Sequence, residues 1–220
     1  MRDRYRAQVR QEVKQAALRQ LAESGPAGVS ISAIGKELGV SGPALYRYFA
    51  GRDDLLTELV IDAYDDLADA LRAAAANQPP RLEPRARLEA AAHAYRARAL
   101  AEPHRYRLLF GPPLPGYDAH TQRLVDAAQA AMNVLLETLR EPADHLVSQP
   151  GPPLAAQLSA WAQSRHLDID PATTLRCVLL WSRLHGFVSL EIAGNFASMG
   201  IEPESLFEIQ LASLADPGMT

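Results

Sequence analysis

Residues 30–49, SISAIGKELGVSGPALYRYF, are the most informative part of this chain, because they predict two short helices joined by a tight turn. The hydroxyl of Ser30 can cap the first helix, and Ile34 and Leu38 lie four residues apart on one face of it. Gly39 then ends that helix, since glycine adopts the left-handed backbone conformation without the steric cost that a side chain brings.

The second predicted helix has an apolar side and a polar side. Ser41 caps it, and Pro43 lies in its first turn, where the missing N–H of proline matters little. Leu45 and Phe49 are four residues apart and face inward. The outward positions carry a small side chain, two phenols and a guanidinium, which are groups suited to the major groove of DNA: Ala44, Tyr46, Arg47 and Tyr48.

The run GVSGPALYRYF at 39–49, followed by GRDDLL at 51–56, resembles the DNA-binding segment of the TetR/AcrR family of bacterial transcriptional regulators. Tyr48 stands where the family more often has histidine, and Arg52 where it more often has lysine; both keep a donor for phosphate. The resemblance implies a dimer that binds a palindromic operator and responds to a small-molecule effector. It also implies that the effector shifts the long fourth helix. This shift would change the distance between the DNA-binding segments of the two protomers.

The residues expected to bind DNA fall into three groups. Arg47 lies outward and is expected to read a base, the alternative being a solvated helix charge; the small residues Gly42 and Ala44 can approach base edges. Lys36, Tyr46, Tyr48 and Arg52 match phosphate-contacting positions of the family, which set register without reading sequence, while Ser30 and Ser41 serve either as caps or as phosphate contacts. The full expected set is Ser30, Lys36, Ser41, Gly42, Pro43, Ala44, Tyr46, Arg47, Tyr48 and Arg52.

The C-terminal half carries a second resemblance. Trp181, His185 and Gly186 in WSRLHGFVSLEIAGNF, together with AYRARALAEPHRYRLLFG at 94–111, resemble the effector domain of a TetR subfamily named for its Trp-His-Gly motif. Trp181 and His185 share one helix face, and Gly186 would let another helix approach closely. Two interpretations stay open for these residues, helix packing and ligand contact.

The fold class expected is all-α, because apolar residues recur at helical spacing and nothing alternates with period two over more than a few residues. Residues 1–51 are expected to form a three-helix helix-turn-helix domain, and residues 52–220 a helical effector-binding and dimerisation domain. The expected helices cover about 4–23, 30–38, 41–49, 52–76, 83–101, 118–140, 154–166, 171–196 and 203–214, with a short apolar segment at 104–110.

Charge and composition narrow the classes of function. The net charge of the 220 residues is -4, yet residues 1–56 carry nine basic and six acidic side chains, which leaves a basic end on an acidic body. The most apolar stretch, 177–190, contains Arg183 and His185 and is too short to span a membrane. With no signal peptide visible, a cytoplasmic protein without membrane contact is expected.

No catalytic or metal motif is visible. The sequence has no GxSxG, P-loop or GxGxxG pattern, so an enzyme is not expected. No two of its six histidines have the spacing of a helical zinc pair, so neither a metal site nor a cofactor is expected. An apolar effector pocket is expected in the helical body, with seven candidate residues: Tyr95, His104, Tyr106, Phe110, Trp161, Trp181 and His185.

We therefore expect a homodimeric DNA-binding transcriptional regulator, a repressor released by an effector. Apolar stripes on the last two long helices are expected to form the intermolecular four-helix bundle of the dimer. The alternative is a small-molecule binding protein whose DNA-binding end is vestigial. The residues of the two stripes are Leu175, Val178, Leu179, Ser182, Gly186 and Ser189, and Leu206, Ile209 and Leu214.

Overall fold

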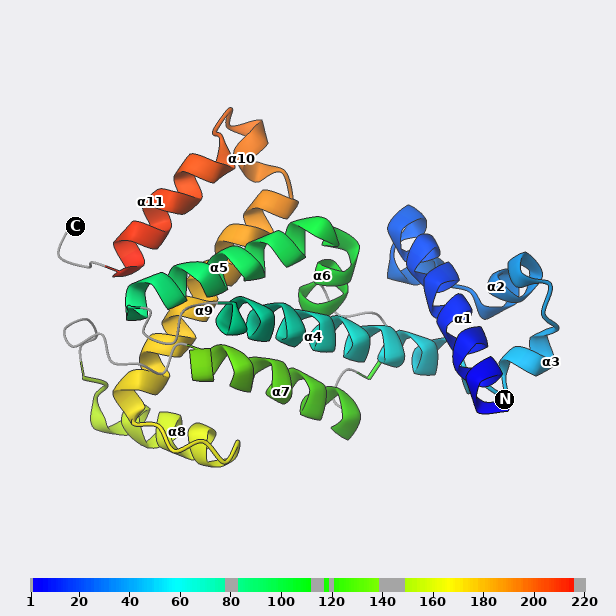
Figure 1. Cartoon of the computed structure of the whole chain (residues 1–220), viewed down its shortest axis with the longest axis horizontal. Coiled ribbons are helices and arrows are strands. Elements are labelled where there is room, and N and C mark those ends of the chain that lie inside the picture. The colour runs from blue at the N-terminus through cyan, green and yellow to red at the C-terminus, as the bar shows by residue number, and fades with distance from the viewer. Residues whose placement is uncertain (1, 78–82, 112–116, 119–120, 139–148, 216–220) are drawn as a thin grey trace. The chain divides into compact units, whose positions relative to one another are not determined.

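A computed structural model describes residues 2–77, 83–111, 117–118, 121–138 and 149–215, and the regular elements in these ranges are all helices (Figure 1). The expected all-α fold is confirmed. None of the helices in these ranges is long and apolar enough to cross a membrane. The helices after the N-terminal three are α4 (Arg52–Ala76), α5 (Pro84–Ala101), α6 (Pro103–Phe110), α7 (Gln122–Thr138), α8 (Pro152–Gln163), α9 (Pro171–Ile192), α10 (Asn195–Ser198) and α11 (Pro203–Ala215).

The first three helices pack around a small apolar core. α1 (Arg2–Ser24) contacts the 3-10 turn η1 (Pro26–Gly28) and α2 (Ile31–Leu38), and α2 in turn contacts α3 (Gly42–Leu45). The predicted three-helix arrangement is therefore present. The buried side chains that join these helices include Val13, Ala17, Leu21, Ile34, Leu45 and Phe49.

The chain forms two compact units, and the functional division predicted at residue 51 stays a prediction. The first unit comprises residues 1–65 and 102–128, and the second comprises 66–101 and 129–220. The α4 helix runs unbroken from Arg52 to Ala76 and so belongs to both. A carboxylate oxygen of Asp54 accepts a hydrogen bond from the Ala50 N–H at 2.9 Å, which stabilises the start of α4.

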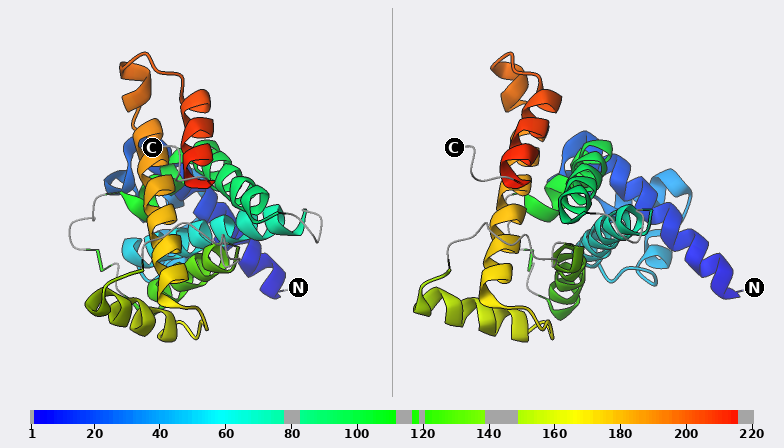
Figure 2. Two further views of the ribbon diagram at one scale, coloured as in Figure 1. Left: turned by 90° about the vertical axis from the view of Figure 1, so that its left-hand side faces the viewer. Right: turned by 60° about the vertical axis from the view of Figure 1, so that its left-hand side comes forward.

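In the second unit, α9 is the helix around which the others gather. It contacts α8, α5, α10 and α11, and Figure 2 shows α8 at one end of α9 and α11 folded back beside the other. The carboxylate of Asp170 caps α9 by accepting from the N–H groups of Ala172 and Thr173 at 2.9 and 3.0 Å. The start predicted from Asp170-Pro171 is thus observed.

Some predicted helix limits are wrong. The helix expected over 171–196 ends at Ile192, because Gly194 takes a left-handed conformation with φ 78° and starts the separate helix α10. The helix expected from residue 118 begins at Gln122. The predicted loop at 111–116 and the connection at 142–153 lie mostly outside the described residues.

Candidate nucleic-acid interface

The turn between α2 and α3 has the geometry that the sequence predicts. The Ser30 hydroxyl accepts a hydrogen bond from the Ala33 N–H at 3.3 Å and caps α2. Gly39 has a left-handed backbone with φ 67° at the other end, and the N–H of Val40 donates to the Gly35 carbonyl at 2.9 Å. Backbone bonds therefore hold the angle between the two helices.

Gly35 allows the two helices to pack closely, although it was not among the predicted residues. A Cβ atom placed on it would lie 2.9 Å from the carbonyl oxygen of Val40 and 3.1 Å from a methyl carbon of Leu45. Since a backbone oxygen cannot retreat as a flexible side chain can, a larger residue would push α2 and α3 apart. The sequence signal for this role is a glycine inside an otherwise regular helical pattern.

The second helix of the pair is shorter than predicted. Only Gly42–Leu45 is α-helical, and residues 46–48 continue as turns. In these turns the Arg47 N–H donates to the carbonyl of Ala44 at 3.3 Å and the Phe49 N–H to that of Leu45 at 3.1 Å, a mixture of three- and four-residue spacings. Leu45 and Phe49 are nevertheless only 0% and 1% exposed, so the inward face is as predicted.

Ser41 does not cap α3 with its side chain. Its backbone is extended, as a cap requires, but its hydroxyl makes no capping hydrogen bond, so the prediction of a Ser41 cap is wrong. Ser41 is exposed at the start of α3. Its other expected role, phosphate contact, stays a prediction.

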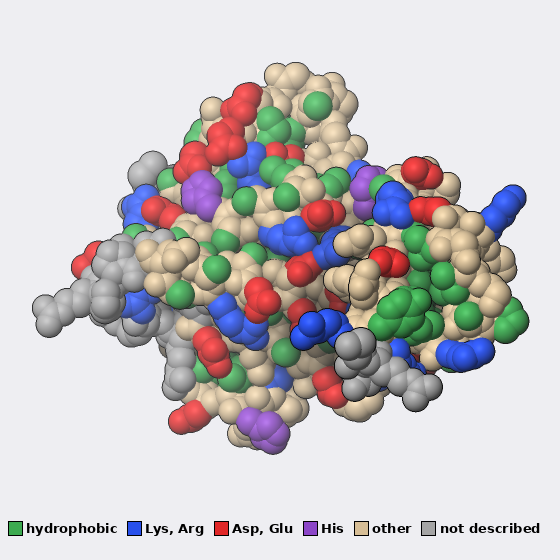
Figure 3. Space-filling model, turned by 45° about the vertical axis from the view of Figure 1, so that its right-hand side comes forward, with side chains coloured by type: hydrophobic (Ala, Val, Ile, Leu, Met, Phe, Trp, Pro, Cys, Tyr) green, Lys and Arg blue, Asp and Glu red, His purple; other side chains and the backbone are tan. Residues whose placement is uncertain are grey.

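The outer surface of the helix pair presents most of the expected DNA-binding residues. Tyr46 is 56% exposed, and Lys36, Ser41, Pro43 and Arg47 are also exposed. The remaining members on this surface are half-buried: Ser30, Gly42, Ala44 and Tyr48. On the molecular face drawn in Figure 3, Lys and Arg side chains lie among Asp and Glu side chains.

α1 holds both ends of the helix pair in place. Arg10 donates to the carbonyl of Tyr48 at 2.6 Å, and its guanidinium lies 4.6 Å from the centre of the Phe49 ring. At the other end, the side-chain oxygen of Gln20 accepts from the N–H of Ser30 at 2.9 Å. The surface that carries Arg47 is therefore supported by contacts formed 10 to 38 residues away in the chain.

Arg52, whose phosphate contact stays a prediction, makes hydrogen bonds within the domain. Its Nε donates to the carbonyl of Val29 at 3.1 Å and its Nη2 to the carbonyl of Pro26 at 2.8 Å, while Nη1 lies 3.7 Å from the Asp53 carboxylate. These bonds tie the first residue of α4 to the turn before α2. The guanidinium thus satisfies two backbone carbonyls of the domain itself.

An ion network joins α1, α4 and α7 inside the first unit. The carboxylate of Glu58 lies 2.9 Å from Arg10, 3.2 Å from Lys14, and within hydrogen-bond distance of Arg123. Lys14 also pairs with Asp62 at 2.9 Å. Burial raises the pKa of Glu58, but the hydrogen bonds from Arg123, Lys14 and Arg10 outweigh that effect and lower the pKa to about 2. Glu58 is therefore ionised at neutral pH.

Three of the seven expected pocket residues lie on α6, in the first unit. Tyr106 is 6% exposed, and His104 and Phe110 are half-buried. The ring of Phe110 lies 5.0 Å from that of Tyr106 and 6.4 Å from that of Tyr64, centre to centre. Burial, followed by the nearby phenol of Tyr117, raises the pKa of Tyr64. The structure thus brings Tyr106 and Phe110 together with an α4 tyrosine that was not predicted.

The other four expected pocket residues lie in the second unit. Tyr95 is only 1% exposed in α5, and Trp161 on α8 stacks with the guanidinium of Arg165 at 4.0 Å. The rings of Trp181 and His185 stack on α9 with centres 5.5 Å apart, and burial lowers the pKa of His185. The predicted pairing of these two residues on one helix face is therefore observed.

Two family models match this architecture. The N-terminal one, described as bacterial regulatory proteins of the tetR family, matches residues 15–59, and the other, described as tetracyclin repressor-like C-terminal domain, matches residues 88–214. The chain belongs to the TetR family. Its predicted helix-turn-helix lies within the first matched segment, and most of its second unit lies within the other. The finer resemblance to the Trp-His-Gly subfamily stays a prediction.

Relatives of similar length agree with this assignment. The TetR-family chain is 32% identical to the HTH-type transcriptional regulator Rv1816 of Mycobacterium tuberculosis, over 93% of this chain and 90% of that protein. It is 42% identical to the crystallised protein SCO4313, with a TM-score of 0.83 over 97% and 98% of the two chains. FadR of Bacillus subtilis, solved in complex with stearoyl-CoA, shares the fold with a TM-score of 0.63 at 14% identity, over 94% and 97% of the chains.

The family and these relatives are transcriptional regulators, and this chain is a DNA-binding transcriptional regulator rather than an enzyme. TetR-family regulators bind operator DNA and small-molecule effectors, typically as dimers. The expected class of function is therefore confirmed.

Proposed function

We propose that this regulator binds a palindromic operator as a homodimer and represses transcription until a small-molecule effector releases it. The observation that carries the proposal is the exposed surface of α3 and the following turn, where Tyr46 and Arg47 project from a segment anchored by the buried Leu45 and Phe49. A rigid support of this kind keeps base-reading side chains in register with a groove.

Within this surface we assign different roles to different residues. Arg47 reads a base, because an exposed guanidinium can donate two hydrogen bonds to a guanine. Gly42, Pro43 and Ala44 allow the backbone to approach base edges, and the Ala44 methyl can meet a thymine methyl. The phosphate contacts come from donors around this centre: Ser30, Lys36, Ser41, Tyr46 and Tyr48.

For Arg52 we propose a positioning role in place of the expected phosphate contact. Its bonds to the carbonyls of Val29 and Pro26 connect the start of α4 to the start of α2. Loss of this side chain would leave those carbonyls without a charged donor. Arg52 then contributes to DNA binding through the placement of the helix pair.

We propose that α9 and α11 form the dimer surface. Leu179 and Leu190 on α9 are 43% and 47% exposed, and Ile209 on α11 is 66% exposed. The two helices contact each other, and Gln210 donates to the carbonyl of Arg183. Apart from the neighbouring residues and backbone of α9 itself, no atom in the described part of the chain lies within 4 Å of a Cβ placed on Gly186, so this position is open to a second protomer. Leu214, which belongs to the predicted stripe, has a side chain outside the described residues.

We propose that the effector binds in the helical domain expected over residues 52–220 and that it is an apolar small molecule. Within the first unit, the rings of Tyr64, Tyr106 and Phe110 lie together and support an apolar lining. The fold neighbour FadR, solved with stearoyl-CoA, gives one precedent for such a ligand in this fold. To release the operator, the effector must bind the DNA-free shape more tightly than the DNA-bound shape.

One experiment tests the proposal and its alternative together. The purified protein selects duplexes from a random DNA pool, and the selected duplexes are sequenced. The protein is then titrated onto the enriched site at several salt concentrations. A regulator selects a palindrome with half-sites about 34–36 Å apart and binds it with an affinity that falls steeply with salt. Selection of no common site would favour the alternative, a small-molecule binding protein with a vestigial DNA-binding end.

A further inference from the structure

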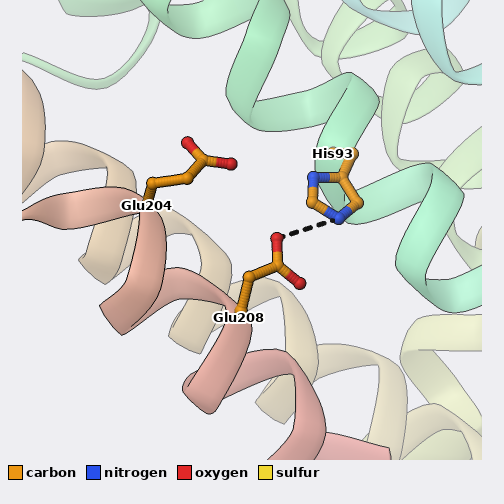
Figure 4. Close-up of side chains that lie close together, drawn as sticks. All are labelled: His93, Glu204 and Glu208. Atoms are coloured by element: carbon orange, nitrogen blue, oxygen red, sulfur yellow. Dashed lines mark ion pairs between the residues drawn. The ribbon is translucent and has the colours of Figure 1, made fainter.

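The structure brings together three metal-binding side chains of the second unit that are far apart in sequence, and we propose that they bind a divalent transition-metal ion. His93 lies on α5, and Glu204 and Glu208 lie one turn apart on α11 (Figure 4). One donor atom from each residue lies within 4.8 Å of the other two. The expectation of no metal site considered only the spacing of histidines along the sequence, which could not find this cluster.

The distances suit an ion after a small movement of the side chains. Nitrogen and oxygen ligands about 2.1 Å from a tetrahedral ion lie roughly 3.4 Å from one another, so the three donors need to approach by little more than an ångström. The side chains of His93, Glu204 and Glu208 are 45%, 60% and 53% exposed, which leaves them room to do so. His93 Nε2 and a Glu208 oxygen are already only 3.3 Å apart.

The charge of the cluster favours a cation. The guanidinium of Arg96 donates two hydrogen bonds to Glu191, at 2.7 and 2.8 Å, and both side chains are only 10% exposed. Glu191 therefore balances the positive charge of Arg96. The carboxylates of Glu204 and Glu208 then place an excess of negative charge beside His93, and a divalent ion would neutralise it.

Neighbouring side chains already orient two of the three proposed ligands. Arg96 donates a hydrogen bond to one oxygen of Glu204, and because a carboxylate has two oxygens the other stays available to an ion. The ring of His93 packs edge-on against Phe207, with centres 5.5 Å apart, and Phe207 is fully buried. Such outer contacts hold metal ligands in place and strengthen binding.

The donor set selects the class of ion. One imidazole and two carboxylates suit Zn²⁺ and its neighbours in the first transition row, whereas Mg²⁺ and Ca²⁺ prefer oxygen ligands alone. Three protein ligands leave at least one position for water. An ion bound here would tie α11 to α5, and this consequence does not depend on the proposed operator or effector.

The test uses the full chain without a histidine tag, titrated calorimetrically with ZnCl2 and, separately, with MgCl2. We expect one Zn²⁺ per chain, no comparable binding of Mg²⁺, and a higher melting temperature at saturating Zn²⁺. His93→Ala and Glu208→Gln should each weaken Zn²⁺ binding by at least about tenfold, since loss of an outer-shell partner alone costs that much, and should abolish the thermal shift.

His166→Ala is the matched control, because His166 is exposed in the turn after α8 and lies outside the cluster. It should bind Zn²⁺ as the wild type does. Cys177 will not compete, since burial raises its pKa to about 11 and the thiol stays protonated. Circular dichroism without metal verifies that each variant folds. If His93→Ala does not fold, the binding of Zn²⁺ to Glu208→Gln tests the proposal. Absence of stoichiometric Zn²⁺ binding, or undiminished binding in a folded cluster variant, would overturn the proposal.

Discussion

Glu58 offers the sharpest test of how the DNA-binding domain is held together. Replacing it with glutamine keeps the side-chain shape but removes the charge that Arg10, Lys14 and Arg123 share. The three cations would then face one another without their common partner. Since Arg10 also holds the carbonyl of Tyr48, we expect Glu58→Gln to weaken operator binding as well as folding.

The size of the effect on folding follows from the pKa of Glu58, which the network lowers from 4.5 to about 2. The side chain is only 15% exposed, so solvent screens the interaction little. At about 1.4 kcal/mol per pKa unit, the charge contributes roughly 3 kcal/mol to the free energy of unfolding at pH 7. Because the pKa is depressed in the folded state, this contribution is complete above pH 4.5 and is lost as the pH falls toward 2.

The assay is denaturant unfolding, followed by circular dichroism, of wild type and Glu58→Gln between pH 7 and pH 3.5. We expect the wild type to be more stable by roughly 3 kcal/mol at pH 7 and this difference to shrink by about 1.4 kcal/mol at pH 3.5. Glu89→Gln is the control, because Glu89 pairs with Arg85 on the exposed surface of α5 and should change stability by less than about 0.5 kcal/mol.

A difference that stays constant from pH 7 to pH 3.5 would refute the reasoning, because it would mean that shape rather than ionisation accounts for the loss. A Glu58→Gln variant as stable as the Glu89→Gln control would refute it more directly. In that case the desolvation of Glu58 would cancel its three ion pairs.

Four further substitutions test the remaining assignments. Arg47→Ala should cost roughly 1–3 kcal/mol per half-site and flatten the base preference at one operator position, and uniform weakening across sequences would make Arg47 a phosphate contact. Arg52→Ala should lower the free energy of unfolding by roughly 1–3 kcal/mol. It should leave unchanged the slope of the logarithm of operator affinity against the logarithm of salt concentration, whereas a slope smaller by about one would show that Arg52 contacts phosphate. Gly35→Ala should destabilise the domain by roughly 1–3 kcal/mol through the clash with the Val40 carbonyl, and wild-type stability in thermal melting would count against that clash. Gly186→Leu should convert dimers to monomers in sedimentation at micromolar concentration, and a wild-type monomer that still binds operator would exclude the proposed dimer.

The sequence by itself determined the features that depend on neighbouring residues. Ser30 and Gly39 delimit α2 because a cap and a left-handed glycine act within one turn of the chain. The long α4 and the start of α9 were predictable for the same reason, from apolar spacing and from Asp170-Pro171. A local motif at 39–56 was also enough to indicate the family, because the family's DNA-binding segment is itself a local structure.

Only the tertiary structure decided the roles of side chains whose partners are distant in the chain. Arg52 was expected to meet phosphate, yet its guanidinium meets carbonyls 23 and 26 residues away. Glu58 and His93 gave no signal in sequence, because the cations around Glu58 come from two other helices, α1 and α7, and the carboxylates near His93 come from α11. A charged side chain takes its function from the groups that surround it in space, and the folding of distant helices against one another places those groups.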